Sequence, residues 1–244
     1  MIYPIADLHH GAEESMEESF MAFIDFIRRT PNAYLIIAGD MLDNGIKGSV
    51  TNVYRQRYMP AEAKRMLAKM LEPVRNRILC GTEGNHEFRN SREVDDDPLY
   101  DVFCKLDIES RYRQNMAFLK LFVGKQDGNG TVNPTYSIVV THGAGGGILT
   151  GGAVNRAEKF GYVLDGGDLL ILGHTHKQFD TTPGKIKIDL HNNKVSIKPF
   201  KVCSVSSWLS YGGYAARMML PPTVQVQTKI TLGATRKEIE IANK

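Results

Sequence analysis

The stretch YLIIAGDMLD, residues 34–43, joins an uninterrupted apolar run to a glycine and two aspartates. The apolar run, 34–38, is short and has no helical periodicity, which is typical of a strand buried on both faces. Gly39 then marks a turn, so Asp40 lies just beyond the end of the strand. The stretch therefore predicts a buried strand of an α/β sheet that carries a carboxylate at its end.

The same design recurs along the chain. Apolar runs at 2–6, 77–80, 136–140 and 169–172 also end near short polar motifs. The motifs are DLHHG at 7–11, GDMLD at 39–43, GNHE at 84–87, THG at 141–143 and GHTH at 173–176, and they hold six of the seven histidines. Only His191 lies outside, in an expected surface turn. Packing gives no reason for histidine and aspartate to repeat at strand ends, so we predict that the motifs serve chemistry.

Helical patterns separate these runs, and a β-rich segment follows them. Glu14 to Arg29 repeats apolar residues at helical spacing, Pro60 to Leu71 begins with a proline suited to a first turn, and further helices are expected at 99–106 and 153–162. Residues 185–205 and 224–241 alternate apolar and polar side chains, as strands with one wet face do. We predict one domain, 1–244, with metal motifs in 7–176 and a mainly β segment in 185–241.

Composition narrows the class of protein. The net charge of +3 neither demands nor excludes a polyanionic partner. The three cysteines are scattered without a CxxC pattern, which favours reduced thiols and a cytoplasmic location. No apolar run approaches a membrane span and no signal-peptide pattern is visible, so we expect no membrane partner. The glycine-rich segment 143–152 lacks the GK[ST] ending of a P-loop and is expected to be a flexible loop beside the site.

The motifs have the composition of a metal site. In an open α/β sheet, ligand sites form beyond the carboxyl ends of the strands, which is where each motif is expected. Imidazole and carboxylate together suit divalent Zn, Fe or Mn. The candidate ligands are too many for one tetrahedral ion, whereas two ions about 3.5–4 Å apart, sharing a carboxylate, use the set better. Such a pair holds a hydroxide nucleophile and clamps phosphate oxygens.

The series DxH, GDxxD, GNHE, HG and GHxH, in this order between residues 7 and 176, resembles the calcineurin-like metallophosphoesterase superfamily. The resemblance implies an α/β fold in which two mixed β-sheets pack face to face between helices, a four-layer αββα sandwich. It implies a phosphoesterase that hydrolyses a phosphomonoester or phosphodiester with a metal-bridged hydroxide. Two divalent ions are implied as cofactors, with Mn favoured and Zn or Fe as alternatives.

The resemblance also assigns roles by position. It implies that one ion is held by Asp7, His9 and His176, that the second is held by Asn85, His142 and His174, and that Asp40 bridges them. It places His86 beside the leaving-group oxygen as general acid or electrostatic stabiliser, with Asp43 orienting its ring. A carboxylate beside an imidazole raises the pKa of that ring and fixes its orientation, which suits a proton donor.

Substrate contacts are less directly indicated. Arg89, three residues beyond His86, is the best candidate for binding phosphate oxygens. His10 is expected either to reach the substrate or to pack at the rim, and Glu87 to hydrogen-bond to groups around the ligands. The segment 54–58, YRQRY, suits nucleic-acid contact, although rim packing is favoured. Trp208, Tyr211 and Tyr214 are expected to cover an edge of the core, unless the glycines at 212–213 bring that segment near the site.

Three functions stay open. The first is a metal-dependent phosphoesterase. Its substrate is a phosphate ester, and a nucleotide or a nucleic acid is among the alternatives. The second is a nuclease of the same superfamily, which the compact single domain disfavours. The third is a scaffold without catalysis, which is disfavoured because no ligand position is missing and His86 is present. The sequence does not identify the substrate, the native metal, the oligomeric state, or the roles of segments 88–113 and 143–152.

Overall fold

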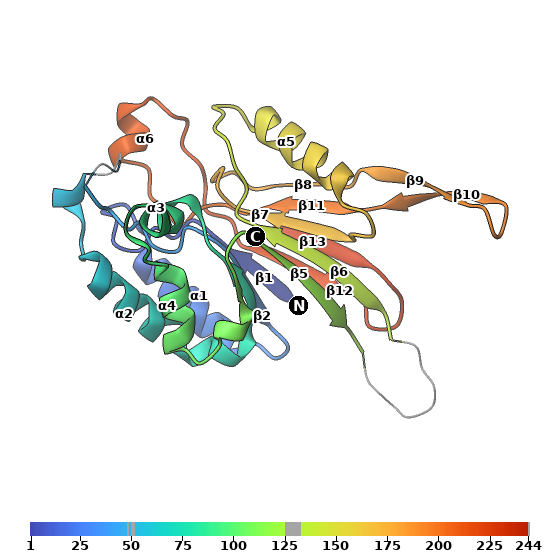
Figure 1. The fold of residues 1–244 in the computed structure, drawn as a ribbon, viewed down its shortest axis with the longest axis horizontal. Coiled ribbons are helices and arrows are strands. Elements are labelled where there is room, and N and C mark those ends of the chain that lie inside the picture. Colours follow the sequence, from blue (N-terminus) through green and yellow to red (C-terminus); the bar gives the residue numbers. More distant parts are fainter. Residues whose placement is uncertain (48, 50–51, 125–132, 244) are drawn as a thin grey trace.

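The computed structural model of the protein describes residues 1–47, 49, 52–124 and 133–243. Two β-sheets pack face to face, and helices cover their outer faces (Figure 1). The first sheet has the order β13 (Ile239–Asn243), β12 (Thr228–Leu232), β1 (Ile2–Ile5), β2 (Tyr34–Ala38), β3 (Ile78–Thr82) and β4 (Tyr112–Arg113). The second has the order β5 (Met116–Phe122), β6 (Thr135–Thr141), β7 (Leu169–Leu172), β11 (Lys201–Ser204) and β8 (Phe179–Thr181).

Both sheets are mixed. Strands β1 to β4 run parallel, β12 pairs antiparallel with β1, and β13 pairs antiparallel with β12. In the second sheet β6, β7 and β11 run parallel, whereas β5 and β8 are antiparallel edge strands. A separate antiparallel hairpin, β9 (Gly184–Asp189) with β10 (Lys194–Pro199), projects from the second sheet (Figure 1). The expected pair of mixed sheets is confirmed.

The helices form the outer layers. Against the first sheet lie α1 (Glu17–Arg29), α2 (Pro60–Leu71) and α4 (Pro98–Lys105), and against the second lies α5 (Thr150–Val163). The remaining helices are α3 (Asn85–Val94) and α6 (Gly213–Arg217), with 3-10 turns η1 (Val53–Arg55), η2 (Glu72–Arg77) and η3 (Glu109–Arg111). Among the described residues, no helix is both long enough and apolar enough to cross a membrane.

Strand β2 explains why an unbroken apolar run was needed. Leu35 and Ile37 belong to the core between the first sheet and its helices. Ile36 and Ala38 point the opposite way, into the core between the two sheets. Side chains alternate across a strand, so a strand covered on both faces must be apolar at every position. A third apolar cluster lies under α5, which completes the layers.

Some element boundaries differ from the expectation. Helix α1 begins at Glu17, not at residue 14, because the backbone N–H of Met16 bonds to the carbonyl oxygen of Trp208 instead. Helix α5 begins at Thr150, so the end of the glycine-rich segment is helical rather than loop. Residues 224–227 alternate in polarity but lie outside any strand, whereas 228–232 and 239–243 pair as β12 and β13.

Helix α3 was not expected from the sequence. Its first turn contains GNHE, and the Glu87 carboxylate accepts a hydrogen bond from the backbone N–H of Gly84 at 2.9 Å. An acidic residue at this third helical position is a usual signal of a helix start. The metal motif therefore opens a helix, and segment 88–113, whose role the sequence does not identify, is mainly the helices α3 and α4.

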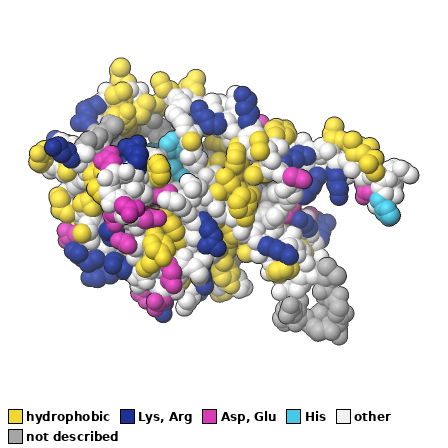
Figure 2. Space-filling model, viewed as in Figure 1, with side chains coloured by type: hydrophobic (Ala, Val, Ile, Leu, Met, Phe, Trp, Pro, Cys, Tyr) yellow, Lys and Arg dark blue, Asp and Glu magenta, His cyan; other side chains and the backbone are white. Residues whose placement is uncertain are grey.

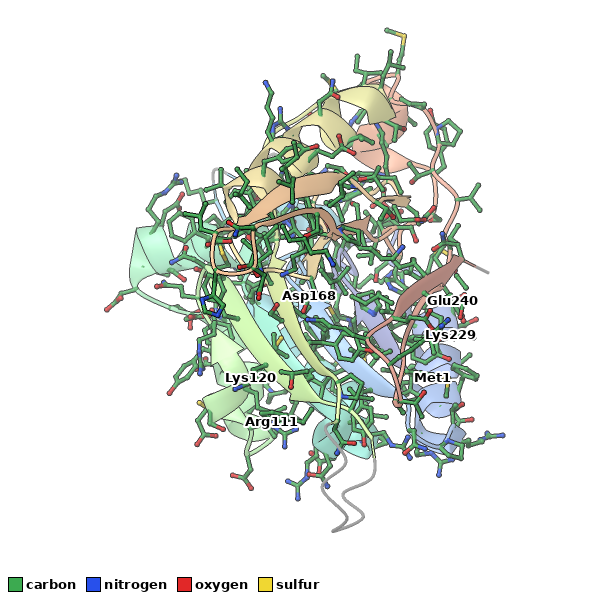
Figure 3. All side chains as sticks on the ribbon, turned by 90° about the vertical axis from the view of Figure 1, so that its right-hand side faces the viewer. Met1, Arg111, Lys120, Asp168, Lys229 and Glu240 are labelled. Atoms are coloured by element: carbon green, nitrogen blue, oxygen red, sulfur yellow. The ribbon has the colours of Figure 1, made fainter. Side chains whose placement is uncertain are left out.

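The C-terminal strands belong to the first sheet. In Figure 3, Lys229 of β12 and Glu240 of β13 lie close to Met1, where the chain enters β1. Tyr136 of β6 ties the two sheets together, because its hydroxyl contacts the carbonyl oxygens of Gly233 at 2.8 Å and Glu238 at 3.0 Å. The first and last parts of the described chain thus share one core.

Candidate metal centre

The polar motifs meet at one edge of the sandwich. Five strands end there, three from the first sheet and two from the second, and each is followed by one motif. The side chains that follow β1, β2, β3, β6 and β7 are, in chain order, Asp7, His9, Asp40, Asn85, His142, His174 and His176. Parallel strands deliver their carboxyl ends to the same edge, which is why residues far apart in the sequence come together.

The backbone around these side chains has an uncommon conformation. Five of the seven have a positive φ: Asp7 (55°), His9 (48°), Asp40 (50°), His174 (69°) and His176 (56°). Left-handed backbone is infrequent for residues other than glycine, and it gathers where the surrounding structure enforces it for function. Here it turns the chain sharply at each strand end, so that successive side chains point into one pocket.

Backbone hydrogen bonds hold two of these turns against each other. The N–H groups of Asp7 and His9 donate to the carbonyl oxygens of Gly39 and Asp40, each at 3.0 Å. The N–H of His10 continues the series to Met41 at 2.9 Å. The loops after β1 and β2 are therefore fixed relative to one another before any ligand binds.

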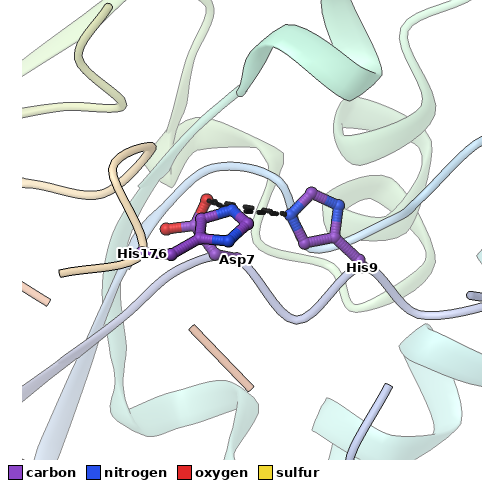
Figure 4. A group of neighbouring side chains, drawn as sticks. All are labelled: Asp7, His9 and His176. Carbon is purple, nitrogen blue, oxygen red and sulfur yellow. Dashed lines mark hydrogen bonds and ion pairs between the residues drawn. The ribbon is translucent and has the colours of Figure 1, made fainter. Parts of the chain in front are cut away.

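A first group of potential ligands consists of Asp7, His9 and His176 (Figure 4). The Nε2 atoms of His9 and His176 lie 3.2 Å apart. The Oδ1 atom of Asp7 is 3.4 Å from His176 Nε2 and 3.9 Å from His9 Nε2. Three ligand atoms from two sheets thus surround one point.

A second group consists of Asp40, His142 and His174, with Asn85 beside it. Asn85 Oδ1 lies 3.1 Å from His142 Nε2 and 2.7 Å from His174 Nδ1. The other ring nitrogen of His142 donates to the carbonyl oxygen of Ala38 at 2.7 Å, which fixes the ring and leaves Nε2 free to act as a ligand.

Asp40 lies between the two groups. Its Oδ2 atom is 3.1 Å from His142 Nε2 in the second group and 3.9 Å from His9 Nε2 in the first. Its Oδ1 atom accepts a hydrogen bond from the backbone N–H of His86 at 2.8 Å, which holds the carboxylate in place. One carboxylate oxygen is thus within reach of both groups.

The donor set fits divalent cations. The Asp7 carboxylate is fully buried, and its Oδ1 atom has no hydrogen-bond partner in the described structure. A buried carboxylate oxygen without a partner is costly unless a cation compensates it. In each group the imidazole nitrogens and carboxylate oxygens lie within 4.8 Å of one another, and such mixed sites suit Zn, Fe or Mn.

The electrostatics of the protein alone show how strongly the site favours positive charge. Burial opposes ionisation of Asp40, but the imidazoles of His142 and His86 outweigh burial and hold the pKa of this carboxyl well below its usual range. Burial likewise lowers the pKa of His142, but the Asp40 carboxylate outweighs it and raises the pKa to about 10. A metal cation that replaced the proton on His142 would be attracted by the same Asp40 carboxylate.

His86 lies beside the two groups, paired with Asp43. Its Nδ1 atom is 3.1 Å from Asp43 Oδ1 and 2.9 Å from the carbonyl oxygen of the same residue. Its Nε2 atom is 3.9 Å from Asp40 Oδ2. Burial lowers the pKa of His86, but the carboxylates of Asp40 and Asp43 outweigh burial and raise it above the ordinary value. Gln56 completes the arrangement by donating to Asp43 Oδ2 at 2.6 Å.

Glu87 organises the backbone beneath the ligands. This fully buried carboxylate accepts hydrogen bonds from the N–H groups of Asp40 (3.0 Å), Leu42 (2.9 Å) and Gly84 (2.9 Å). It therefore joins the loops after β2 and β3, as the expected supporting role requires. Gly84 is needed in this contact, because a Cβ at that position would overlap the Asp40 carboxylate.

A cavity of about 680 Å³ opens over the site. Its wall includes Asn85, His86, His174 and His176, and the glycine-rich residues 145–147 border it as expected. Figure 2 shows histidine side chains, in cyan, in a recess of this face, close to dark blue Lys and Arg side chains. The volume is that of a pocket for a small organic ligand.

Two expected substrate contacts lie elsewhere. The His10 side chain is fully buried, with Nδ1 3.0 Å from a Glu17 carboxylate oxygen and its ring against Tyr58. Since no surface of His10 is open to a substrate, its structural role is packing. Arg89 donates to the carbonyl oxygen of Asp43 at 3.5 Å and does not line the cavity as far as the described residues define it.

The aromatic segments also divide. In YRQRY, Tyr58 and the arginine at 57 contact the 13–17 segment, whereas Tyr54 is 99% exposed, so most of this stretch packs at the rim. Trp208 is buried in the core, as expected. Tyr211 and Tyr214 line the cavity instead of covering the core. Their glycine-rich neighbourhood was the only sequence signal for that position.

The comparison with protein families agrees with this site. The family model for calcineurin-like phosphoesterases matches residues 2–178, a range that contains all seven candidate ligands and His86. A protein from Streptococcus pneumoniae described as a predicted phosphoesterase is similar in structure, with 10% identity, 98% of this chain and 87% of that chain covered, and a TM-score of 0.40. A metallophosphoesterase from Sphaerobacter thermophilus has 14% identity, 85% and 76% coverage, and a TM-score of 0.38.

A comparison with curated proteins gave no match. The assignment therefore depends on the family match, which spans well over half of the chain and ends just after the last motif. The chain belongs to the calcineurin-like phosphoesterase family and is a metal-dependent phosphoester hydrolase.

Proposed function

We propose that the protein is a binuclear phosphoesterase, with two divalent ions held side by side. In this proposal Asp7, His9 and His176 hold one ion, Asn85, His142 and His174 hold the other, and Asp40 contacts both. The observation that carries the proposal is the position of Asp40, whose Oδ2 atom is within 3.9 Å of ligand atoms in both groups. Mn is the proposed metal, with Zn and Fe as alternatives.

Each part of the chain then has a chemical task. Bound divalent ions supply a lowered pKa for water and withdraw charge from phosphate oxygens. His86 donates a proton from Nε2 to the leaving-group oxygen, because this ring lines the cavity next to both ligand groups. Asp43 positions the ring through Nδ1 and favours its charged form. Glu87 holds Asp40 and the start of α3 in fixed positions, because its carboxylate accepts hydrogen bonds from the backbone N–H groups of Asp40 and Gly84.

The proposed substrate is a phosphomonoester or a small phosphodiester. A cavity of about 680 Å³ accommodates a ligand of that size. The structure gives the nuclease alternative less support than the sequence does. Both arginines and Tyr58 of segment 54–58 form hydrogen bonds to the 13–17 segment, so they are less available to a nucleic acid. We also propose that the chain is one domain, since β12 and β13 complete the sheet that β1 begins.

The compartment follows from the thiols. Cys80 and Cys203 are buried and free, and Cys104 is exposed and free. We propose a reducing compartment such as the cytoplasm, because free cysteines persist where thiols are kept reduced.

The test is metal loading followed by hydrolysis. Protein stripped with a chelator and reloaded with Mn, Zn or Fe is expected to bind two ions per chain by elemental analysis. The Mn form is expected to hydrolyse p-nitrophenyl phosphate, its bis ester, or both. A stoichiometry of one ion at saturation would contradict the binuclear arrangement. Failure on both esters with every metal would contradict hydrolysis of small phosphate esters.

A further inference from the structure

One wall of the cavity carries features that metal binding does not use. It is formed by the segment 209–223, which includes helix α6, the helix above α3 in Figure 1. Tyr211 and Tyr214 face this cavity with 53% and 47% of their surfaces exposed, and Arg217 follows on the same helix. The two exposed tyrosine rings and Arg217 thus line the same cavity as the candidate metal ligands, and they point to a ligand with more than a phosphate group.

The segment is held to the metal-binding loop. Trp208 is 3% exposed and packs edge-on against Phe20 with ring centroids 5.2 Å apart. Its backbone N–H donates to the carbonyl oxygen of Asp7 at 3.0 Å, and the N–H of Ser210 donates to that of Glu14 at 2.9 Å. The chain that carries Tyr211 therefore starts from a fixed point next to a candidate ligand.

The turn before α6 is also closely packed. Gly213 has a φ of +46°, and a Cβ at this position would overlap the Glu14 carboxylate. The glycine lets the segment pass directly over the 13–15 loop. This close approach explains how Tyr214 reaches the cavity, which Arg217 of the same helix also lines.

The charge of the cavity selects among ligands. Arg55, Arg156, Lys177 and Arg217 line it, together with the acidic Glu13, Glu14 and Asp43. Arg55 is paired with Glu13 at 3.3 Å, and Arg156 and Lys177 donate to carbonyl oxygens of the glycine-rich loop at 2.9 and 3.0 Å. The Arg55–Glu13 pair carries no net charge, whereas hydrogen bonds to carbonyl oxygens leave the charges of Arg156 and Lys177 in place. Together with Arg217, these two side chains favour an anionic ligand.

We propose that the substrates of this site are nucleoside phosphates, with the base stacked on Tyr211 and Tyr214 and with Arg217 facing the base. The proposal rests on the proposed phosphoesterase function and specifies its substrate class. A nucleoside phosphate combines, in one small molecule, a phosphate for the ions and an aromatic base for the far wall. Base stacking on aromatic side chains tolerates any base, so the class is defined by the presence of a base.

Binding separates the base from the phosphate. Calorimetry compares adenosine 5′-monophosphate with ribose 5-phosphate, which has a hydroxyl in place of the base. It uses the full-length Mn-loaded protein in a His86→Ala background, which is expected to keep its metal and to turn both ligands over slowly. We expect the nucleotide to bind roughly 5- to 100-fold more tightly, the range for one stacked base. In the Tyr211→Leu/Tyr214→Leu variant this ratio is expected to fall to about one fifth or less, while the affinity for ribose 5-phosphate is unchanged. The Tyr211→Phe/Tyr214→Phe control keeps its rings and the ratio.

Hydrolysis gives an independent measurement. Thymidine 5′-p-nitrophenyl phosphate and methyl p-nitrophenyl phosphate share the scissile bond and the leaving group and differ in the nucleoside. The leucine variant is expected to lose kcat/KM on the thymidine ester only. If wild type shows no preference for the nucleoside in either assay, the inference is overturned, and continued turnover of the methyl ester leaves the phosphoesterase function intact. Tighter binding of a single-stranded oligonucleotide than of any mononucleotide would also overturn it.

Folding of the variants is checked by circular dichroism. Both tyrosines are about half exposed, so the leucine variant is expected to fold. Arg217→Ala serves as a second variant that leaves both rings in place. It is expected to weaken adenosine 5′-monophosphate binding by more than it weakens ribose 5-phosphate binding, and equal weakening of both would argue against a role for Arg217 at the base.

Discussion

Replacing Asp43 with asparagine tests whether this carboxylate tunes His86. The variant keeps the shape of the side chain and removes one negative charge 3.1 Å from His86 Nδ1. An opposite charge at this range typically shifts a pKa by about 1–3 units, or about 1.4–4 kcal/mol. The carbonyl oxygen of residue 43, at 2.9 Å from Nδ1, stays as an acceptor, so the ring is expected to keep its orientation. The variant therefore separates charge from geometry.

The sign of the effect follows from the direction of the pKa shift. The pKa of His86 in the native protein lies above the ordinary value, so the protonated ring persists to higher pH. A proton donor is active below its pKa and is lost as the pH rises through it. Without the Asp43 charge, the alkaline limb of the kcat profile is expected to move down by about 1–3 pH units. Near neutral pH, kcat should fall by about 10- to 100-fold, since a proton donor typically contributes 10²–10⁴-fold.

The assay is a pH–rate profile at saturating Mn, with bound metal measured on the same samples. Saturation matters because Asp43 also lies 3.4 Å from His9 Nδ1, and outer carboxylates support the affinity of metal-binding histidines. Asp25→Asn on α1, where Asp25 pairs with Arg28 on the surface, is a matched control that should leave the profile unchanged. An alkaline limb that stays in place with full metal occupancy would refute the role assigned to Asp43.

Three further outcomes test other parts of the structure. His86→Ala should retain nearly all of its metal in elemental analysis and lose kcat by about 10²-fold or more. Asp40→Ala should lose both metal and activity. Equal metal loss in the two variants would contradict the assigned roles. Glu87→Gln cannot accept all three backbone hydrogen bonds, so urea denaturation should show a loss of about 1–3 kcal/mol, and an unchanged midpoint would remove Glu87 from the support of the loops. Phe20→Ala removes a fully buried ring and should lower the free energy of unfolding by about 3–5 kcal/mol, while Met21→Ala at a 42% exposed position should change it little, and comparable losses would contradict the packing of α1.

Local sequence determined the buried strands, most of the helices between them and the identity of the polar motifs, whereas the stacking of two sheets was implied only by the family resemblance. The run at 34–38 favoured a strand with two covered faces, because it is apolar without helical periodicity, and Leu35 and Ile36 do lie in different cores. The same logic located the strand ends, and therefore placed histidine and aspartate at one edge of the sandwich. Helix α2 begins at Pro60, as expected, because proline fits the first helical turn.

Only the tertiary structure decided which side chains contact one another. His10 and His9 are neighbours in sequence, yet one lies buried against Glu17 and the other lies in a ligand group, because side-chain direction depends on the positive φ at residue 9. Helix α3 forms where GNHE meets the backbone of the β2 loop, a contact between segments far apart in the chain. Tyr211 reaches the cavity because Trp208 is fixed in the core and the backbone N–H of Ser210 donates to the carbonyl oxygen of Glu14. Composition and periodicity report local preference, whereas these contacts arise only when distant segments pack together.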